Sequence, residues 1–332
     1  MGWPRQVAIV GAGYMGRGIA EVLALAGAHC ALADVSTERA VAAAELLFVE
    51  TARHERDGLL PSGSAAAVRA RIRPAVDIED AASAADLVVE AVYEDKATKT
   101  TALHRIEATA DREVPIATNT SAISIRLLSK ALARPERFLG AHWFNPPQFV
   151  PGVELIACET TRADVLDRVE AFLVRAGKSP CRVADSPGFV GNRLQYALFQ
   201  EAAAVVEEGL ATPEIVDQVV RGTFGFRLPF FGPFAIADMA GLDVYDGAYR
   251  VFHEAFPDRF VAPQALRERI ERGELGAKTG VGFVIRNAEQ ADEMAAQRDR
   301  AYAALARVVE AFDGNQVNHG GPGGVADTRE AP

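Results

Sequence analysis

Four polar side chains lie where predicted elements begin or end, and their types could carry acid–base chemistry. His142 follows the apolar run "RFLGA" and precedes two prolines, Ser121 lies in "NTSAIS", Glu154 in "VELI" and Asn192 in "GFVGNR". An imidazole can accept a hydroxyl proton near neutral pH, above all when a carboxylate orients its second nitrogen. Hydroxyl and amide groups can hold an oxygen on which charge develops. The four residues are therefore candidates for a reaction site.

Each candidate also has a structural explanation. His142 could be a core histidine beside a turn, and Glu154 could be a carboxylate at the solvent edge of a strand. Asn192 could cap a helix, and Ser121 could be an ordinary turn residue. His142 and Glu154 come within reach only if the segment "FNPPQFVPG" folds back.

The N-terminal segment predicts a dinucleotide site. Gly11, Gly13 and Gly16 in "GAGYMG" have the G-x-G-x-x-G spacing, between the apolar strand "QVAIV" and a helix that begins with Tyr14 and Met15. These glycines allow a tight turn, close approach of a pyrophosphate and close helix packing. Asp34 ends the next strand, at about the expected roughly 20 residues, and can accept hydrogen bonds from a ribose. Its charge would repel a 2′-phosphate, and residues 35–37 include no arginine, so we expect NAD rather than NADP.

The elements that must position these residues alternate between strands and helices. Apolar strands are predicted in "HCALAD", "DLVVEAV", "VPIAT", "RFLGAH", "VELIAC" and "PCRVA", and helices over 36–57, 65–71 and "KATKTTALHRIEAT". Alternation of this kind predicts an α/β fold with a Rossmann-type, doubly wound, mainly parallel sheet. We expect this domain to span residues 1–185, with the helices of 36–71 folded as a hairpin.

The pattern changes near residue 186. Helical periodicity dominates "PGFVGNRLQYALFQEAAAVVEEG" and continues through "PEIVDQVV", "ADMAGLDVYDGAYRVFHEAF", "PQALRERIERG" and "AEQADEMAAQRDRAYAALARVVEAF". We therefore expect an all-helical second domain over 186–313. Residues 314–332 are rich in glycine and polar residues, which predicts a disordered tail.

Composition excludes several functional classes. The 332 residues are 49% hydrophobic and 24% charged, and the net charge is −10. A nucleic acid or anionic membrane would require a basic surface, so neither partner is expected. No apolar run approaches the roughly 20 residues of a membrane span. The three scattered cysteines, the six dispersed histidines and a start that leads directly into a strand predict a cytoplasmic protein without a metal site or signal peptide.

Several motifs together resemble the L-3-hydroxyacyl-CoA dehydrogenase family. They are the glycine turn, "VVEAVYEDKATK", "NTSAIS", "HWFNPP", "VELI", "GFVGNR", "GPFAIADMAGLD" and "KTGVGF", in order and nearly as far as Phe283. The resemblance implies reversible, NAD-dependent oxidation of an L-3-hydroxyacyl thioester, such as 3-hydroxybutyryl-CoA. It implies that His142 and Glu154 form the catalytic pair and that Ser121 and Asn192 contact the substrate oxygen. Further implied cofactor contacts are Glu94, Lys99, Ser121 and Lys278.

The resemblance also implies a homodimer formed through the helical domain. An aromatic cluster could lie at that interface or inside the core; it consists of Phe224, Phe226, Phe230, Phe231 and Phe234.

The identity of the substrate stays open. The segments "NPPQFVPGVEL" and "NRLQYALFQEAAAVVEEG" are closer to the branch of lambda-crystallin-like L-gulonate 3-dehydrogenases, whereas "ADMAGLD" and "KTGVGF" resemble the fatty-acid enzymes. Where the latter grip coenzyme A with a serine and a lysine, this chain has Glu50 and Asp57. Arg53 and Arg56 could replace that grip or could belong to a solvated helix face. A free hydroxy acid, a carrier-tethered hydroxyacyl group and a non-catalytic dinucleotide-binding protein therefore remain alternatives.

Overall fold

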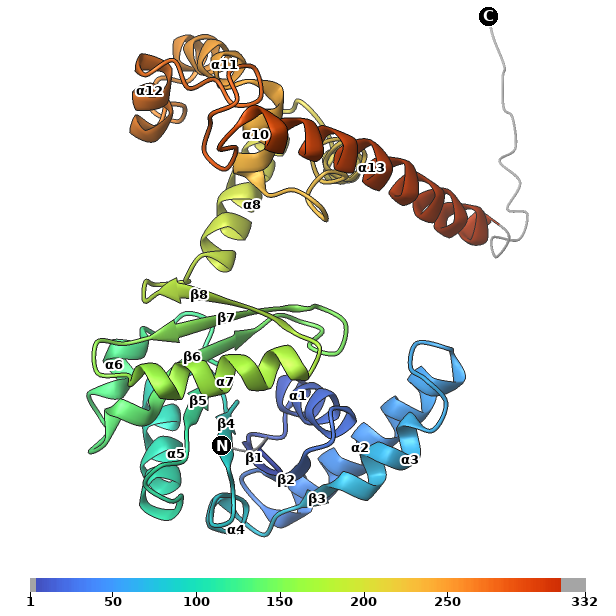
Figure 1. The fold of residues 1–332 in the computed structure, drawn as a ribbon. Helices are drawn as coiled ribbons and strands as arrows, with labels where there is room; N and C mark the ends of the chain where they lie inside the picture. The colour runs from blue at the N-terminus through green and yellow to red at the C-terminus, as the bar shows by residue number, and fades with distance from the viewer. Residues whose placement is uncertain (1–3, 318–332) are drawn as a thin grey trace, which may run out of the picture. The chain divides into compact units, whose positions relative to one another are not determined.

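The computed structural model describes residues 4–317, and contacts divide the chain into two compact units, residues 1–199 and 200–332. The first unit holds the sheet, and the second is helical (Figure 1). The division falls inside helix α8, Gly191–Glu207.

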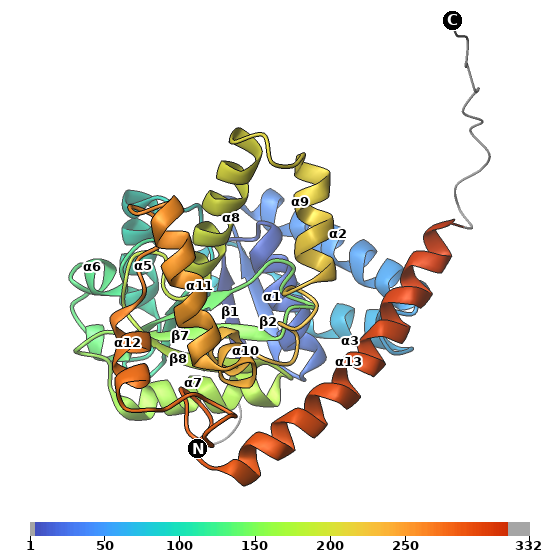
Figure 2. The same ribbon diagram turned by 90° about the horizontal axis from the view of Figure 1, so that it is seen from above.

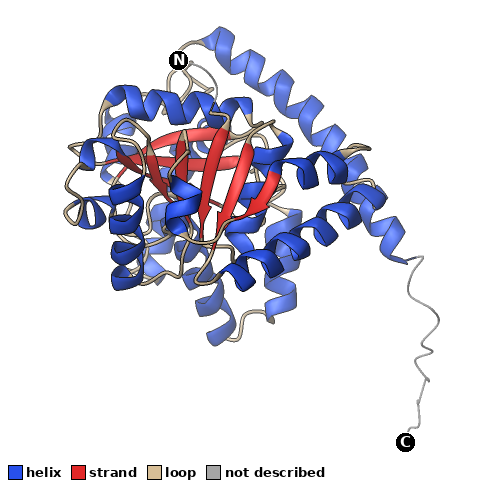
Figure 3. Ribbon diagram, turned by 90° about the horizontal axis from the view of Figure 1, so that it is seen from below, coloured by secondary structure: helices blue, strands red, loops and turns tan. Residues whose placement is uncertain are grey.

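The first unit is built on one eight-stranded sheet in the order β3-β2-β1-β4-β5-β6-β7-β8. Figure 3 shows the strands in red with helices around them. The strands are β1 Gln6–Val10, β2 His29–Ala33, β3 Ile72–Pro74, β4 Leu87–Glu90, β5 Ile116–Thr118, β6 Phe138–Trp143, β7 Gly152–Ala157 and β8 Ser179–Ala184. All neighbouring strands pair in parallel except β6 and β7, which are antiparallel. The predicted Rossmann-type, mainly parallel sheet is confirmed.

Helices cover both faces of the sheet, as the apolar strands require. They are α1 Tyr14–Leu25, α2 Thr37–Arg56, α3 Ser64–Arg71, α4 Ile78–Ala82, α5 Lys96–Thr109, α6 Ile125–Ser129 and α7 Ala163–Arg175, with a 3₁₀ turn at Pro135–Arg137. Val7 and Ile9 of β1 pack with residues of α1, α2 and α7, whereas Ala8 and Val10 pack with residues of α4, α5 and α6. The alternation along β1 thus divides the core into two apolar layers.

The predicted helices over 36–57 and 65–71 are confirmed as α2 and α3, which form a hairpin between β2 and β3 (Figures 1 and 2). The side chain of Ser36 caps α2 by accepting a hydrogen bond from the backbone of Arg39. The sequence reasoning did not predict β3, α4, α6 or α7.

The second unit contains no strand longer than an isolated bridge among its described residues. Its helices after α8 are α9 Pro213–Gly222, α10 Pro233–Ala240, α11 Leu242–Ala255, α12 Gln264–Glu271 and α13 Ala288–Val317. The run "ADMAGLDVYDGAYRVFHEAF" forms two helices instead of one, because Gly241 has a φ of 100° and ends α10. Residues 314–317 continue α13, and the rest of the expected tail, 318–332, lies outside the described residues.

Candidate active site

The side chains of His142 and Glu154 form a buried pair. They are directly opposite each other in the register of antiparallel strands β6 and β7, so their side chains lie on the same face of the sheet. His142 Nδ1 lies 2.9 Å from Glu154 Oε2, and the two residues are 3% and 6% exposed. The segment between the strands does fold back, as the pairing required.

The second oxygen of Glu154 is also fixed. Its Oε1 accepts hydrogen bonds from the backbone N–H groups of Val190 (3.0 Å) and Gly191 (2.8 Å), at the start of α8. The rings of Phe144 and Phe189 lie beside the imidazole, with centroid distances of 4.6 and 5.5 Å. A fully bonded carboxylate therefore holds Nδ1 of His142, while its Nε2 has no hydrogen-bond partner among the described residues. This arrangement suits a general base or acid.

Ser121 and Asn192, which are far apart in the sequence, lie together. Asn192 Nδ2 donates a hydrogen bond of 3.0 Å to the carbonyl oxygen of Ser121. Ser121 lies in the turn after β5, and β5 neighbours β6. In the same segment, Asn119 Oδ1 accepts a hydrogen bond from the backbone N–H of Trp143, next to His142 (2.9 Å). All four candidates thus lie at the ends of adjoining elements of the first unit.

The loop after the histidine is tied down by a lysine that the sequence reasoning missed. Lys178 is buried and donates hydrogen bonds to the carbonyl oxygens of Pro147 and Val150. Its ammonium also lies 5.3 Å from the centroid of the Trp143 ring. Burial lowers the pKa of Lys178. No motif indicated this residue, because its partners are backbone carbonyls.

The glycine turn fits a dinucleotide. Gly11 has a φ of 105°, and a Cβ there would lie 2.4 Å from Ala91 O. A Cβ on Gly16 would lie 1.9 Å from Gly11 O, so α1 packs tightly on the turn. A Cβ on Gly13 would meet nothing within 4 Å. This open space lies at the N-terminus of α1, where Tyr14 is exposed and Met15 packs against the core, and it can accept a pyrophosphate.

Asp34 is placed beside this turn. Its Oδ2 accepts a hydrogen bond from Ala12 N (2.9 Å), and its Oδ1 accepts one from Val35 N (2.8 Å). Arg39, which the sequence reasoning did not consider, donates to the same Oδ1 at 3.0 Å. The carboxylate therefore stands at the end of β2, where a ribose contact was predicted.

The remaining predicted contacts have different surroundings. Lys99 is completely buried, and Glu94 binds the Ser121 turn. Lys278 belongs to the second unit, where it pairs with Asp243 at 2.8 Å. Their predicted contacts with the cofactor stay predictions.

The two hairpin arginines line different pockets. Arg53 lines one of about 370 Å³ together with Glu50 and Asp57, whereas Arg56 lines a second one and lies 3.8 Å from Asp57. The first pocket thus carries two acidic residues beside one arginine, and the substrate contacts predicted for Arg53 and Arg56 stay predictions.

Residues 4–317 lack two kinds of feature. No helix there has the length and apolarity to cross a bilayer. No group of three or more histidine, cysteine, aspartate or glutamate residues there is arranged to hold a metal ion.

Comparison with known proteins gives consistent matches over both units. Residues 6–186 match the NAD-binding domain of 3-hydroxyacyl-CoA dehydrogenase, and residues 188–286 match its C-terminal domain. The chain is 36% identical over 309 residues to 5-formyl-3-hydroxy-2-methylpyridine 4-carboxylate 5-dehydrogenase of Mesorhizobium japonicum, covering 92% of this chain and 98% of that protein.

Two solved structures are also similar to the chain over most of its length. The (S)-3-hydroxybutyryl-CoA dehydrogenase of Ralstonia eutropha superposes with a TM-score of 0.63 at 36% identity, covering 84% of this chain and 98% of that one. A 3-hydroxyacyl-CoA dehydrogenase of Archaeoglobus fulgidus superposes with a TM-score of 0.74 at 31% identity, covering 92% and 99%.

Proposed function

Because the chain belongs to the 3-hydroxyacyl-CoA dehydrogenase family of NAD-dependent oxidoreductases, we propose that it reversibly oxidises an L-3-hydroxyacyl thioester, such as 3-hydroxybutyryl-CoA, to the 3-oxoacyl form. The observation that carries the proposal is the buried His142–Glu154 pair, in which one imidazole nitrogen is fixed and the other has no partner among the described residues. This is the arrangement that proton removal from a hydroxyl group requires.

In the oxidation, Nε2 of His142 accepts the hydroxyl proton while the carbon–hydrogen bond breaks and the carbonyl forms. NAD, when bound, supplies the acceptor for the hydride. Glu154 stabilises the imidazolium, because its carboxylate accepts a hydrogen bond from the Nδ1–H group and keeps its negative charge. Ser121 Oγ and the Asn192 amide hold the substrate oxygen as its charge changes. In the reverse direction, the imidazolium returns the proton.

His142→Ala tests this proposal. The variant is assayed by NADH absorbance with a panel of hydroxyacyl thioesters and free hydroxy acids, and kcat should fall by about 10²–10⁴. His29→Ala is a matched control, because His29 is exposed at the start of β2. Near-wild-type turnover of His142→Ala would refute the base. Tight NAD binding by the wild-type protein without turnover of any substrate would favour a non-catalytic role.

A free hydroxy acid is the second candidate substrate. Glu50 and Asp57 line the pocket beside Arg53 and would repel the phosphates of coenzyme A. The name of the Mesorhizobium relative also describes its substrate as a carboxylate. The kcat/KM values for a coenzyme A ester, the matching N-acetylcysteamine thioester and the free acid separate the candidates. A preference for the short thioester over the coenzyme A ester would point to a carrier-tethered group.

We also propose that the protein is a homodimer, with its apolar helical surface covered by a second copy. Phe224, Phe230 and Phe234 in the second unit are 39%, 41% and 56% exposed, whereas Phe231 is buried. Phe226 contacts Tyr302, with ring centroids 5.7 Å apart. Large exposed apolar surfaces of this kind mark interaction sites. Sedimentation of wild type and Phe230→Glu tests the dimer.

A cytoplasmic location agrees with the three unpaired cysteines.

A further inference from the structure

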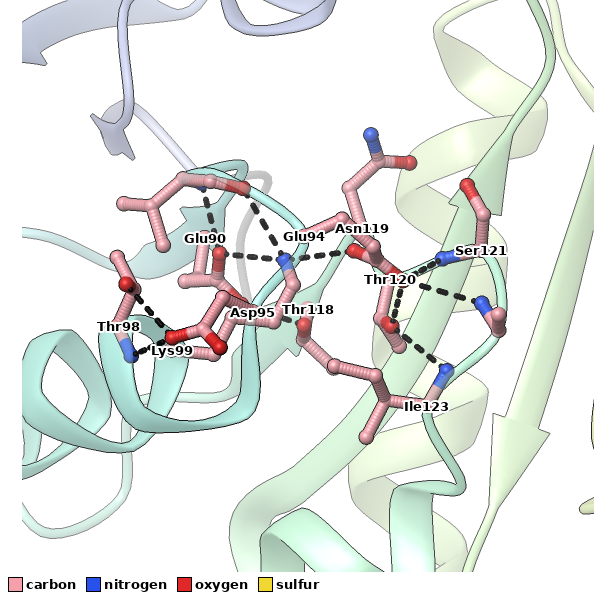
Figure 4. A network of polar contacts seen from close by, with 12 residues as sticks. Glu90, Glu94, Asp95, Thr98, Lys99, Thr118, Asn119, Thr120, Ser121 and Ile123 are labelled. Carbon is pink, nitrogen blue, oxygen red and sulfur yellow. Dashed lines mark hydrogen bonds and ion pairs between the residues drawn. The ribbon is translucent and has the colours of Figure 1, made fainter.

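The ammonium of Lys99 is enclosed by protein oxygens at the junction of β4, α5 and the Ser121 turn (Figure 4). Lys99 is 0% exposed, and its Nζ lies 2.9 Å from Glu90 Oε1, 3.3 Å from Val92 O and 3.3 Å from Glu94 Oε2. Two of these contacts are hydrogen bonds, to Glu90 and to the carbonyl oxygen of Val92, and the third is an ion pair with Glu94. The ammonium of Lys99 is therefore held between two carboxylates.

Glu94 connects this lysine to the turn that carries Ser121. While its Oε2 faces Lys99, its Oε1 accepts hydrogen bonds from Thr120 Oγ1 (2.6 Å), Ser121 N (2.8 Å) and Ala122 N (3.1 Å). One carboxylate oxygen thus binds three consecutive residues. The dashed lines in Figure 4 follow this path from Lys99 to Ser121.

The peptide groups of Ser121 are held from two sides. Its N–H donates to Glu94, and its carbonyl oxygen accepts from Asn192 Nδ2 at 3.0 Å. The Oγ of Ser121 has no hydrogen-bond partner among the described residues. The network therefore fixes the backbone of Ser121 while leaving its hydroxyl available to a substrate.

Charge balance explains why this network needs a lysine. Glu90 is completely buried; it also accepts hydrogen bonds from Val92 N (2.7 Å) and Thr118 Oγ1 (2.5 Å). Glu90 and Glu94 would repel each other without a cation between them. Partial burial by itself raises the pKa of Glu94, but the hydrogen bond from Thr120, the charge of Lys99 and the two backbone N–H groups outweigh it and lower that pKa.

We propose that Lys99 and Glu94 are positioning residues for Ser121: the Lys99 ammonium keeps the Glu94 carboxylate charged and in place, and Glu94 fixes the turn that presents the Ser121 hydroxyl. This inference rests on the proposed role of Ser121 in holding the substrate oxygen. It assigns Lys99 an action through Glu94, and the predicted contact of Lys99 with the cofactor stays a prediction.

The test combines Lys99→Met, Glu94→Gln and Ser121→Ala. Lys99→Met should lower kcat on the order of tenfold or more and speed amide hydrogen exchange at Ser121 and Ala122. The glutamine of Glu94→Gln keeps a side-chain oxygen that can accept the hydrogen bonds from the Ser121 turn, but it carries no charge. The double variant Lys99→Met/Glu94→Gln should therefore have a higher kcat than Lys99→Met alone. Its amide hydrogen exchange at Ser121 and Ala122 should also be slower.

A double-mutant cycle separates this inference from the proposed function. If Lys99 acts through Ser121, Lys99→Met should lower kcat only slightly in a Ser121→Ala background. The hydroxyl that Lys99 helps to position is already absent from that variant. Wild-type turnover of Ser121→Ala would refute the proposed role of Ser121 itself. Two results would overturn the positioning role and leave the proposed function standing. One is a full additional loss of kcat in the Ser121→Ala background. The other is weaker binding of NADH with unchanged amide hydrogen exchange at Ser121.

Two further variants control for folding. Lys96→Met, at an exposed position in the first turn of α5, should match wild type in all readouts. If Lys99→Met does not fold, Glu94→Ala replaces it, since the Glu94 side chain is 37% exposed. Glu94→Ala should speed exchange at Ser121 and lower kcat more than Glu94→Gln does, and equal effects of the two would overturn the proposal.

Discussion

Replacing Glu154 with glutamine changes one heavy atom of the proposed catalytic pair and should invert the hydrogen bonding of His142. In the native protein, Oε1 accepts from Val190 N and Gly191 N, and Oε2 lies 2.9 Å from His142 Nδ1. A carboxylate is only an acceptor, so Nδ1 carries the proton and Nε2 has the lone pair that a base needs. A glutamine must place its NH₂ group on one of these two sides.

The two placements differ in free energy. If the NH₂ group faced Val190 and Gly191, two part-buried N–H donors would lose their acceptor, at a cost of up to about 1–3 kcal/mol each. If it faces His142, the backbone bonds survive, and Nδ1 becomes the acceptor. We expect this second orientation. It places the proton on Nε2, which can then no longer accept the hydroxyl proton.

The expected result for Glu154→Gln is a fall in kcat of about 10²–10⁴ for alcohol oxidation, with little change in stability because the side chains have nearly the same shape. NADH absorbance measures the rate, and thermal unfolding followed by circular dichroism measures stability. Glu159→Gln, at an exposed position shortly after the same strand, is the matched control. If Glu154→Gln oxidises substrate within about threefold of wild type, the tautomer argument is wrong.

Three more predictions concern the groups around the pair. A Cβ at Gly191 would lie 2.5 Å from Cζ of Phe144, so Gly191→Ala should disturb the ring beside His142 and lower kcat/KM, whereas Gly247→Ala, with nothing within 4 Å, should leave it unchanged. Lys178→Met removes two hydrogen bonds to the loop after His142 and should lower the free energy of unfolding by about 1–3 kcal/mol, measured in urea. The pKa of Glu94 lies below its usual 4.5 in the folded state, so its stabilising contribution should be complete above that value and decrease as the pH falls through the lowered pKa. Urea unfolding of wild type and Glu94→Gln at several pH values should therefore converge in acid, and a constant difference would contradict this.

The pairing of His142 with Glu154 was implied by the family resemblance, and the residues alone required only that the segment between two predicted strands fold back. Two apolar strands lie on either side of a segment rich in proline, and an antiparallel return places residues of the two strands opposite each other. The parallel sheet and the glycine turn follow equally from local patterns, because buried strands and G-x-G-x-x-G spacing are local features.

Contacts between distant segments were not accessible in this way. The sequence reasoning did not predict the ion pair of Lys99 with Glu90, because the direction of the lysine side chain depends on how α5 packs against the end of β4. A signal did exist: Glu90 lies within the predicted buried strand "DLVVEAV", and a buried carboxylate needs a cationic partner nearby. Arg39 and Lys178 gave no comparable signal, because their partners were recognisable only once β2 and the loop after β6 were placed.

The backbone before α8 shows why the orientation of Glu154 depends on more than its own strand. Phe189 has a φ of 50°, an uncommon value for a bulky side chain, and follows Gly188 with a φ of 73°. This left-handed turn directs the next two N–H groups, of Val190 and Gly191, at one oxygen of Glu154, and successive N–H groups in such turns form anion-binding sites. Phe189 is also 1% exposed and packs 5.5 Å from the His142 ring, so its burial holds the turn in place. Phe189 therefore contacts the proposed base, His142, with its ring, and its backbone conformation orients the Glu154 carboxylate.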